Sequence, residues 1–414
     1  MIESIKINSW RQYQDIDIKL HPRLTIITGA NGAGKTTLLT LISRHFGWPS
    51  NLVGTPKKDK KTGVLKFVSD FWKSITNDER SIPQNQNKVG EIEYSNRIKG
   101  NILVPDNVGS TYQPQIMNQQ QVQGIHIPSH RPNYKYQNVP NISTVAISKQ
   151  TAYNNYRSVK HQRHQGGNVP KSETYFIKET LISLATFGYG NEIVNKDEEA
   201  IRLFEGFQDV LRDVLPPKLG FQKLAIRIPE VILITKSGEF AIDAVSGGIA
   251  SIIDLAWQIY MFENTGKPFI VTFDEPENHL HPEMQKTILP NFLKAFPDAQ
   301  FIIASHNPFI ISSVPDSKVY VLNYDENDRV RSILLDNIEK SGSANEILRD
   351  VLGIDSTKPE WVNEQIDKII DKYSDKGITA DNINNFKNEL KSIGLDKLVH
   401  TSVADLIQRS KGNQ

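Results

Sequence analysis

The chain has 414 residues with a formal net charge of +1, 38% hydrophobic and 23% charged residues, and no cysteine. Its length predicts two or three packed units, and the lack of thiols excludes disulfides and thiolate zinc sites. No apolar run approaches the roughly 20 residues that a membrane crossing requires, and the N-terminal residues lack the basic-then-apolar order of a signal peptide. We therefore expect a cytoplasmic protein that does not bind membranes.

The N-terminal segment predicts three strands followed by a helix. Residues 2–10 and 15–20 alternate apolar and polar side chains, whereas residues 24–28 read LTIIT and predict a strand buried on both faces. Residues 36–45 have helical periodicity. The expected order at this point is therefore strand, glycine-rich loop, helix.

The loop between that strand and helix carries a phosphate-binding motif. It reads GANGAGKT, which fits G-x-x-x-x-G-K-[ST]. Glycines let backbone N–H groups turn toward a phosphate, and the following helix directs its positive end at it. We expect Lys35 to reach the β- and γ-phosphate oxygens as a catalytic group, and the Thr36 hydroxyl to coordinate magnesium. The predicted ATP-binding residues are Gly29, Asn31, Gly32, Ala33, Gly34, Lys35, Thr36 and Thr37.

The region between this motif and residue 220 predicts mostly helix. The expected elements are a loop with a basic tip at 47–65 and helices at 64–80, 173–188 and 194–214. The last of these is amphipathic, and Pro216 and Pro217 end it.

Residues 107–172 contain no Asp or Glu and are rich in Asn and Gln. Their cations are Arg131, Lys135, Lys149, Arg157, Lys160, Arg163 and Lys171, with Tyr112, Tyr134, Tyr136, Tyr153 and Tyr156 interleaved. Cations and aromatic rings without repelling acids favour a DNA contact, for which we select Arg157, Lys160 and Arg163. A face for an acidic protein partner and a plain surface insertion remain open.

Residues 221–243 predict two strands joined at residues 236–238, and the sequence VSGGI (245–249) opens the next helix. Ser246, Gly247 and Gly248 offer a hydroxyl and free N–H groups to an anion. Such a triplet alone is often only a helix N-cap, so its place in the chain decides the interpretation. The triplet lies between the phosphate loop and a second motif, which is acidic.

That second motif follows a buried strand at residues 269–273 and reads DEPENHLHP. Asp274 would meet magnesium beside Thr36, and Glu275 would orient and deprotonate the attacking water. An ordinary pair of helix-capping acids is the structural alternative. The phosphate loop upstream favours the catalytic interpretation.

A further buried strand at 300–304 leads to His306, which we expect to contact the γ-phosphate; a structural histidine at a strand end is the alternative. Residues 318–335 predict a hairpin, and the last ~75 residues predict helices. The remaining close histidine pairs lack metal-site spacing, and we expect loop positioning or exposure instead. These pairs are His279 with His281, and His161 with His164.

Together these motifs resemble the ABC-type ATPases of the RecF/SMC group, and most closely the AAA-type ATP-binding relatives of OLD-family nucleases and of anti-phage systems of the Septu and PARIS kind. The resemblance covers about 1–45 and 220–350, and VSGGI departs from the LSGGQ signature at Val245 and Ile249. It implies an α/β fold: an ABC-ATPase head with a mixed sheet around the P-loop, a helical lobe with an insertion, and a helical C-terminal extension.

The resemblance also implies how the chain divides and assembles. The head would comprise residues 1–100 and 221–340, the insertion and helical lobe 101–220, and the extension 341–414. Two or more protomers would sandwich ATP and Mg²⁺ between heads, with Ser246 of one closing on the γ-phosphate held by Lys35 of the other. A Q-loop residue is expected near 124–132, with Arg131 as candidate, and Trp10 or Tyr13 would stack near adenine.

Two departures from the group narrow the expected function. Only 209 residues (36–244) separate Lys35 from Val245, which excludes a long coiled coil, and no E-then-D-x-D pattern of a Toprim nuclease follows residue 350. We therefore expect an ATPase that senses or regulates a separate effector protein, such as a nuclease, in phage defence. A RecF-like DNA-repair ATPase and a low-turnover assembly scaffold are the alternatives. A transporter ATPase is disfavoured, because its head lacks these N-terminal strands and the 107–172 insertion.

Overall fold

The computed structural model describes residues 1–48, 51–58, 63–69, 85–105, 107–129, 136–164, 166–264, 266–336, 340, 342–353, 359–374 and 379–412. The chain forms two compact units, Met1–Ile347 and Leu348–Gln414. Within the described ranges, no helix combines the length and apolar character that a membrane span requires.

The first unit is built on an 11-stranded mixed sheet. Its strands, in spatial order, are β11 (Gln115–Met117), β8 (Lys99–Pro105), β7 (Gln86–Tyr94), β1 (Ile2–Trp10), β2 (Tyr13–Lys19), β19 (Val330–Leu334), β18 (Lys318–Tyr324), β3 (Leu24–Gly29), β17 (Ala299–Ala304), β16 (Phe269–Asp274) and β12 (Gly124–Ile127). The strands from β11 to β2 pair antiparallel, whereas β18, β3, β17, β16 and β12 run parallel. The predicted mixed α/β sheet around the phosphate loop is therefore confirmed.

The parallel strands carry the functional motifs at their carboxyl ends. Every residue of β3, β16 and β17 is buried, as expected for parallel strands covered on both faces. Helix α1 (Lys35–Ser43) follows β3 directly and packs against β16 and β17. The carboxyl ends of neighbouring parallel strands lie at the same edge, so the phosphate loop and the acids after β16 meet there.

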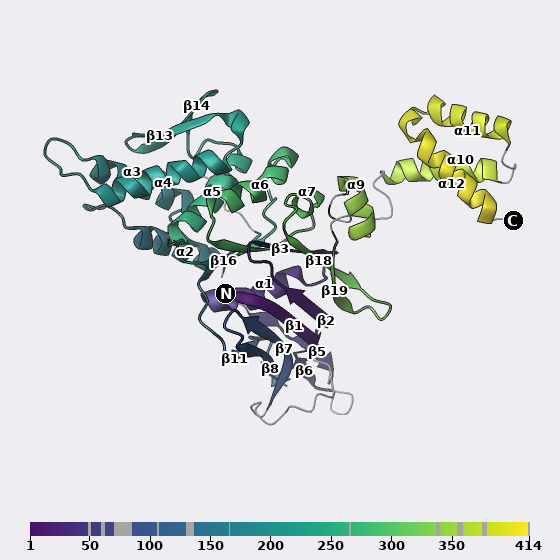
Figure 1. Cartoon of the computed structure of the whole chain (residues 1–414), viewed down its shortest axis with the longest axis horizontal. Helices are drawn as coiled ribbons and strands as arrows, with labels where there is room; N and C mark the ends of the chain where they lie inside the picture. The colour runs from purple at the N-terminus through teal and green to yellow at the C-terminus, as the bar shows by residue number, and fades with distance from the viewer. Residues whose placement is uncertain are drawn as a thin grey trace. The chain divides into compact units, whose positions relative to one another are not determined.

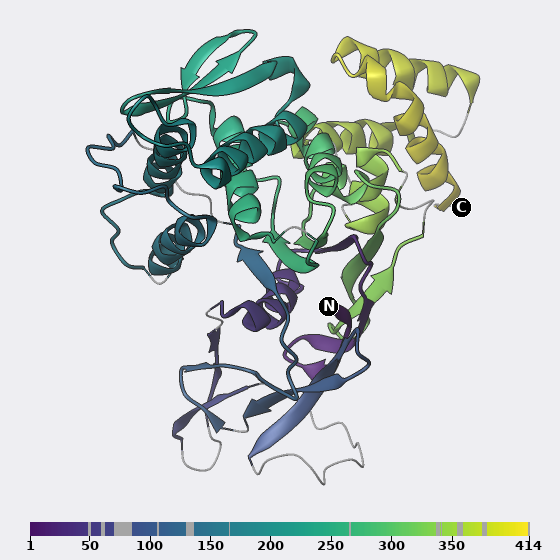
Figure 2. The ribbon, with the colours of Figure 1, turned by 60° about the vertical axis from the view of Figure 1, so that its left-hand side comes forward.

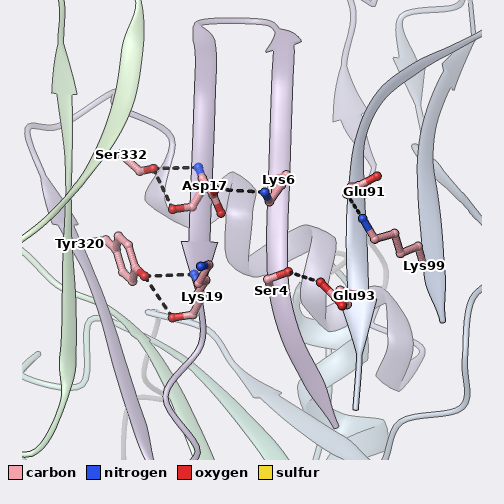
Figure 3. A network of polar contacts seen from close by, with 9 residues as sticks. All are labelled: Ser4, Lys6, Asp17, Lys19, Glu91, Glu93, Lys99, Tyr320 and Ser332. Carbon is pink, nitrogen blue, oxygen red and sulfur yellow. Dashed lines mark hydrogen bonds and ion pairs between the residues drawn. The ribbon is translucent and has the colours of Figure 1, made fainter. Parts of the chain in front are cut away.

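The half of the sheet from β11 to β2 joins the other half at β19, which pairs antiparallel with β18. The backbone pairing between β19 and β2 is reduced to Tyr13 and Val330. Side chains continue the connection (Figure 3). The Ser332 hydroxyl accepts from the Asp17 N–H at 2.8 Å and donates to its carbonyl at 3.2 Å. The Tyr320 hydroxyl does the same for Lys19, at 3.0 and 3.1 Å. The two halves of the sheet are thus held together by side-chain hydrogen bonds.

A helical lobe lies beside the parallel strands. Its helices are α2 (Lys149–His164), α3 (Glu173–Tyr189), α4 (Glu198–Val214) and α5 (Gly247–Phe262), and α6 (Pro282–Ala295) packs against α4. Figures 1 and 2 both show α2–α5 gathered beside the parallel strands, with β7 and β8 extending to the opposite end. The predicted helices at 173–188 and 194–214 are confirmed. The Asp197 carboxylate caps α4 by accepting from two N–H groups.

Residues 221–241 form three strands rather than the predicted two: β13 (Phe221–Arg227), β14 (Glu230–Thr235) and β15 (Gly238–Ala241). The turn at residues 236–238 lies where it was expected. The prediction missed the turn at Pro229, which cannot donate a ladder hydrogen bond and divides the first predicted strand.

The predictions of a loop at 47–65 and of a helix from residue 64 are wrong for the described residues 51–58 and 63–68; most of the expected basic tip, residues 59–62, lies outside the described residues. In place of the loop and the start of the helix lie the short strands β4 (Leu52–Val53), β5 (Thr55–Lys58) and β6 (Leu65–Val68). They pair with each other and with β9 (Asn107–Val108) and β10 (Thr111–Tyr112). Pairing with distant strands thus overrides the local pattern. Residues 70–80 of the expected helix lie outside the described residues.

The second unit is helical, as predicted, with α10 (Glu360–Ser374), α11 (Ala380–Ser392) and α12 (Val399–Gly412) around an apolar core that includes Ile366, Ile370, Phe386 and Leu390. The remaining short helical turns are η1 (Arg44–Phe46), η2 (Pro217–Leu219), α7 (Pro308–Ile311), α9 (Ala344–Glu346), η3 (Ile347–Val351) and η4 (Asp396–Leu398).

Candidate nucleotide-binding site

The phosphate loop connects β3 to α1 along a path that requires glycine at two points. Gly29 has φ +132° and Gly34 has φ +97°, in the left-handed region that favours glycine. A methyl group on Gly29 would collide with the Leu322 carbonyl, and one on Gly34 with the Tyr13 hydroxyl. The glycine spacing of the motif is therefore dictated by contacts with β18 and β2.

The turn between β1 and β2 holds the loop from outside. The Tyr13 hydroxyl donates to the Gly34 carbonyl at 2.6 Å, and the Gln12 amide donates to the Gly32 carbonyl at 3.2 Å. The expectation that Trp10 or Tyr13 stacks on adenine is wrong in this structure, because both side chains are fully buried in the core. Burial also raises the pKa of Tyr13, so its hydroxyl remains a hydrogen-bond donor to the loop.

Lys35 is the first residue of α1, and its side chain is folded back onto the loop. Its Nζ donates to the carbonyls of Gly29 at 2.8 Å and Ala30 at 3.1 Å, and the residue is 8% exposed. Burial lowers the pKa of Lys35, and the nearby carboxylates, of which Glu275 acts most strongly, oppose that shift. The ammonium group is thus held beside the space where phosphate oxygens would lie.

Thr36 and Asp274 bring the two motifs together. The Thr36 hydroxyl donates to Asp274 Oδ2 at 3.0 Å across a sequence separation of 238 residues. Asp274 is the last residue of β16 and is 6% exposed. A hydroxyl and a carboxylate are oxygen ligands of the type that Mg²⁺ prefers, so these two residues fit a magnesium site.

Glu275 and His306 follow the neighbouring strands β16 and β17, and the structure places them side by side. His306 Nδ1 lies 3.5 Å from Glu275 Oε1, and the two side chains are 52% and 30% exposed. The Asn278 amide donates to Glu275 Oε2 at 3.0 Å, and the Glu275 N–H donates to the Ala304 carbonyl at 2.8 Å. The acid is therefore oriented from two sides while remaining accessible to water.

Several residues that support this pair had no role predicted from the sequence. The Ser305 hydroxyl donates to Glu277 Oε1 at 2.6 Å, and both residues are buried. The Asn278 amide also donates to the Ser129 carbonyl at 3.1 Å, which links the acidic motif to the segment after β12. Glu277 and Asn278 lie within DEPEN and Ser305 lies within ASHNP, and this position inside the motifs was the signal that could have identified them. Arg131, the Q-loop candidate, lies outside the described residues.

The other residues predicted to bind ATP differ in how far they are exposed to solvent. Asn31, Gly32 and Thr36 are exposed and Thr37 is partly buried. Ala33 is fully buried in the core cluster, so its side chain serves packing and its backbone alone is left for phosphate. Lys35, Thr36, Asp274, Glu275 and His306 thus come together at the carboxyl ends of β3, β16 and β17.

Ser246 lies elsewhere, at the start of α5. It is exposed, and its side chain makes no hydrogen bond to cap the helix. The chain before it is anchored by Asp243, whose carboxylate accepts from the buried Lys178 ammonium at 2.6 Å. A methyl group on Gly247 would meet nothing within 4 Å, whereas one on Gly248 would lie 3.1 Å from the His279 carbonyl. The SGG element is thus a fixed helix start that faces outward.

The four histidines of the two close pairs have structural surroundings. His281 caps α6 by accepting from the Glu283 N–H at 3.3 Å, and His279 is exposed beside it with φ +68°. His161 and His164 pack against the Trp48 ring, with centroid distances of 4.6 and 5.1 Å. Among the residues that the structure describes, no group of three or more His, Cys, Asp or Glu could hold a metal ion.

The structure revises the choice of DNA-contacting residues. The Lys160 ammonium is buried and donates to Gln258 Oε1 at 2.6 Å, Arg157 donates to the Phe46 carbonyl at 2.8 Å, and Arg163 lies 3.0 Å from Glu173. Tyr112 and Tyr156 are buried as well. These cations and rings therefore serve internal contacts. Arg131, Tyr134 and Lys135 lie outside the described residues.

Comparison with known proteins gives matches at the family and the protein level. A model described as an AAA domain matches residues 4–212, just over half of the 414 residues. A second AAA domain model, described with the AbiEii toxin of type IV toxin–antitoxin systems, matches residues 188–312.

One relative matches over most of the chain, and others match over shorter segments. The chain is 22% identical to the Septu protein PtuA of Bacillus thuringiensis over 404 residues, which cover 91% of each chain. It is 30% identical over 103 residues to the Retron Vc95 probable ATPase of Vibrio cholerae, covering 23% of this chain and 20% of that protein. It is 46% identical over 52 residues to the OLD nuclease of Thermus scotoductus, covering 12% and 10%.

Proposed function

This chain belongs to the AAA domain family, and on that premise we propose that it is an ATPase of anti-phage defence that binds ATP with magnesium and hydrolyses it. The similarity to a Septu protein over 91% of both chains supports the defence role. The shorter similarity to a retron ATPase supports the activity.

The observation that carries the ATPase proposal is the contact between Thr36 and Asp274. A glycine-rich turn or an acid pair can each occur by chance, but here the hydroxyl after the loop lysine lies 3.0 Å from the carboxylate at the end of β16. Chain segments this distant in sequence meet at such a point only because the sheet places β3 beside β17 and β17 beside β16. The arrangement matches what binding of a metal-bound triphosphate requires.

Each residue has a distinct part in the proposed reaction. Loop N–H groups bind the phosphates, and the Lys35 ammonium exchanges its Gly29 and Ala30 carbonyl partners for phosphate oxygens. Magnesium, held by Thr36 and Asp274, would neutralise charge on the phosphates. Glu275, oriented by the Asn278 amide, accepts a proton from the attacking water.

His306 completes the site from the side of β17. Its imidazole lies next to the Glu275 carboxylate, so it can donate a hydrogen bond to the γ-phosphate that the water attacks. Loss of that phosphate removes the acceptor, which makes the histidine a reporter of hydrolysis.

The exposed SGG element supports a site shared between two protomers. The uncapped Ser246 hydroxyl and the N–H groups at the start of α5 are available to an anion from another molecule. In the proposed assembly they close on the γ-phosphate bound by Lys35 of the second protomer. ATP would then hold the two heads together, and hydrolysis would release them.

A separate effector protein, such as a nuclease, is the proposed recipient of this signal. The ATPase residues belong to the first unit, and the second unit is a helical bundle that offers a surface for a partner. A RecF-like repair ATPase and an ATP-dependent scaffold with little turnover are the competing functions.

Phosphate release measured on the wild type and on Glu275→Gln tests the activity. We expect turnover in the wild type and a loss of about 100-fold or more in the variant, because a general base contributes about that factor. Glu364→Gln, an exposed acid on α10, is the matched control and should leave turnover unchanged. Equal, near-zero turnover in the wild type and in Glu275→Gln would contradict the enzymatic function and favour the scaffold.

Light scattering with Glu275→Gln, which should retain ATP, tests the shared site. ATP should shift this variant from monomer to dimer or larger, and a second change, Ser246→Arg, should prevent the shift while ATP still binds. An ATP-induced shift that survives Ser246→Arg would contradict closure through the SGG element.

A further inference from the structure

Three of the groups assigned to the γ-phosphate end of the site lie on one flank of β3. The local sheet order is β18, β3, β17, β16, and Asp274, Glu275 and His306 follow the last two strands. In a nucleoside triphosphate the base and the γ-phosphate are at opposite ends of the molecule. With the γ-phosphate beside β17 and β16, the base is therefore expected on the opposite flank, beside the end of β18.

The last residue of β18 is an aromatic residue that pairs with Val330 of β19 but extends past the end of β3. The register pairs Tyr320 with Ile27 and Leu322 with Gly29, so Tyr324 lies two residues further, level with the phosphate loop. Tyr320 and Leu322 are buried in the core cluster that includes α1 residues. Tyr324 continues their alternation on the same face of the strand, but it is 42% exposed because it lies past the core.

The ring lies close to the loop without blocking it. A methyl group built on Gly32 would be 3.6 Å from the Tyr324 hydroxyl oxygen, which is ordinary van der Waals distance. Tyr13, which contacts the same loop from β2, is fully buried and offers no ring face, and Trp10 is fully buried as well. Tyr324 therefore supplies an exposed ring face on this flank, which the two buried rings cannot.

The hairpin that carries Tyr324 is fastened to the turn that holds the loop. The Arg329 guanidinium donates to the Arg11 carbonyl at 3.1 Å, and the Val330 N–H donates to the Gln12 carbonyl at 2.8 Å. Gln12 in turn donates to the Gly32 carbonyl. The position of the ring is thus set by the same contacts that shape the phosphate site.

We propose that Tyr324 is the platform on which the base of the bound nucleoside triphosphate stacks. The inference rests on the proposed function, because it requires that the loop binds the triphosphate. Aromatic stacking accepts any base, since every base has a π-face, so Tyr324 strengthens binding of ATP and GTP alike. It adds nothing to binding of inorganic triphosphate, which has no base.

The test is calorimetric binding of ATP, GTP and inorganic triphosphate, each with magnesium, to the full chain and its variants. Stacking of one base on an aromatic residue corresponds to about 10-fold in affinity. Tyr324→Ala should weaken ATP and GTP binding by about that factor and leave triphosphate binding unchanged, whereas Tyr324→Phe should bind all three like the wild type. Tyr189→Ala, which removes a ring that is 43% exposed at the end of α3, is the matched control and should change nothing.

The outcomes separate this inference from the function on which it rests. A wild type that binds neither ATP nor triphosphate would overturn the proposed function. A wild type that binds ATP, with unchanged affinity in Tyr324→Ala, would overturn the stacking role alone. Equal loss of ATP and triphosphate in Tyr324→Ala would assign the residue to loop support. Loss in Tyr324→Phe equal to that in Tyr324→Ala would assign the contact to the hydroxyl. Either result overturns the platform.

Discussion

Two buried lysines show how differently similar side chains are used in this molecule. Lys35 and Lys160 are 8% and 7% exposed, and both donate hydrogen bonds over short distances. The acceptors of Lys35 are the carbonyls of Gly29, at the buried end of β3, and of Ala30, at the start of the exposed loop, and phosphate oxygens can replace them. The acceptor of Lys160 is the Gln258 side chain, which itself donates to the buried Asp254 carboxylate. The first lysine is poised for a ligand, and the second completes a core.

The difference teaches which sequence signals carry functional information. Lys35 lies in a motif whose spacing follows from a strand, a tight turn and a helix, so the backbone path fixes where its ammonium lies. Lys160 was selected from composition, as one cation among many in residues 107–172. Composition gives the charges of a segment but not their direction, and α2 directs this one inward.

The largest expected effect comes from disturbing the backbone of the loop. Gly34→Ala would place a methyl group against the Tyr13 hydroxyl at a residue with φ +97°. We expect ATP affinity to fall on the order of 1,000-fold, from strain and displacement of the loop together. Gly166→Ala is the matched control, because Gly166 also has positive φ, +80°, but no neighbour within 4 Å of the added methyl group. ATP affinity is measured by calorimetry. Equal losses of affinity in the two variants would show that strain at a residue with positive φ, without the collision with Tyr13, explains the effect.

The second prediction contrasts the two lysines directly. Lys160→Met leaves Gln258 and Asp254 without their cation and should lower the free energy of unfolding by about 3 kcal/mol. Lys35→Met should lower it by about 1 kcal/mol, because it removes hydrogen bonds to neutral backbone carbonyls and leaves no buried charge unpaired, and should abolish ATP binding. Urea-unfolding midpoints and calorimetry check the pair. Equal destabilisation by the two substitutions, or loss of ATP binding in both variants, would show that the two lysines do not differ in role.

The strands that carry the motifs were predictable because each is a short buried run bounded by a motif residue. The meeting of Thr36, Asp274, Glu275 and His306 at one edge of the sheet could likewise be expected from their place after those runs. The antiparallel strands β7 and β8 and helix α2 were not predicted. In α2 the buried positions Ala152, Tyr156 and Val159 have helical spacing, but Asn, Gln and charged residues around them mask it.

The parts of the site that sequence did not predict depend on register and tertiary pairing. Tyr324 lies beside Gly32 because β18 runs parallel to β3 in one particular register. Gln12 reaches the loop because the β1–β2 turn folds over it. Neither residue has a local signal, since partner strands separated by hundreds of residues set both positions.

The smallest expected effect concerns a histidine of the basic stretch that carries no charge at neutral pH. Burial, followed by the charges of Arg157 and His164, lowers the pKa of His161 from 6.5 to about 4. The unfolded chain therefore takes up a proton below about pH 6.5 that the folded chain refuses until about pH 4. Stability should fall across that window as pH falls, by about 1 kcal/mol once partial exposure of the ring is allowed for.

His161→Phe tests this directly, because it keeps an aromatic ring against Trp48 and removes the titrating nitrogen. Unfolding free energies measured at pH 7.5 and pH 5 should differ less in the variant than in the wild type, by about 1 kcal/mol. The comparison between variants cancels the carboxylates and other histidines that titrate in both proteins. An equal pH dependence would mean that folding leaves the pKa of His161 unchanged, so that residues 107–172 would regain one cation at pH 5. A smaller pH dependence in the variant would instead show that folding suppresses the charge of His161. The surroundings of this side chain, and not the basic composition of residues 107–172, would then set its role, as they do for Lys160.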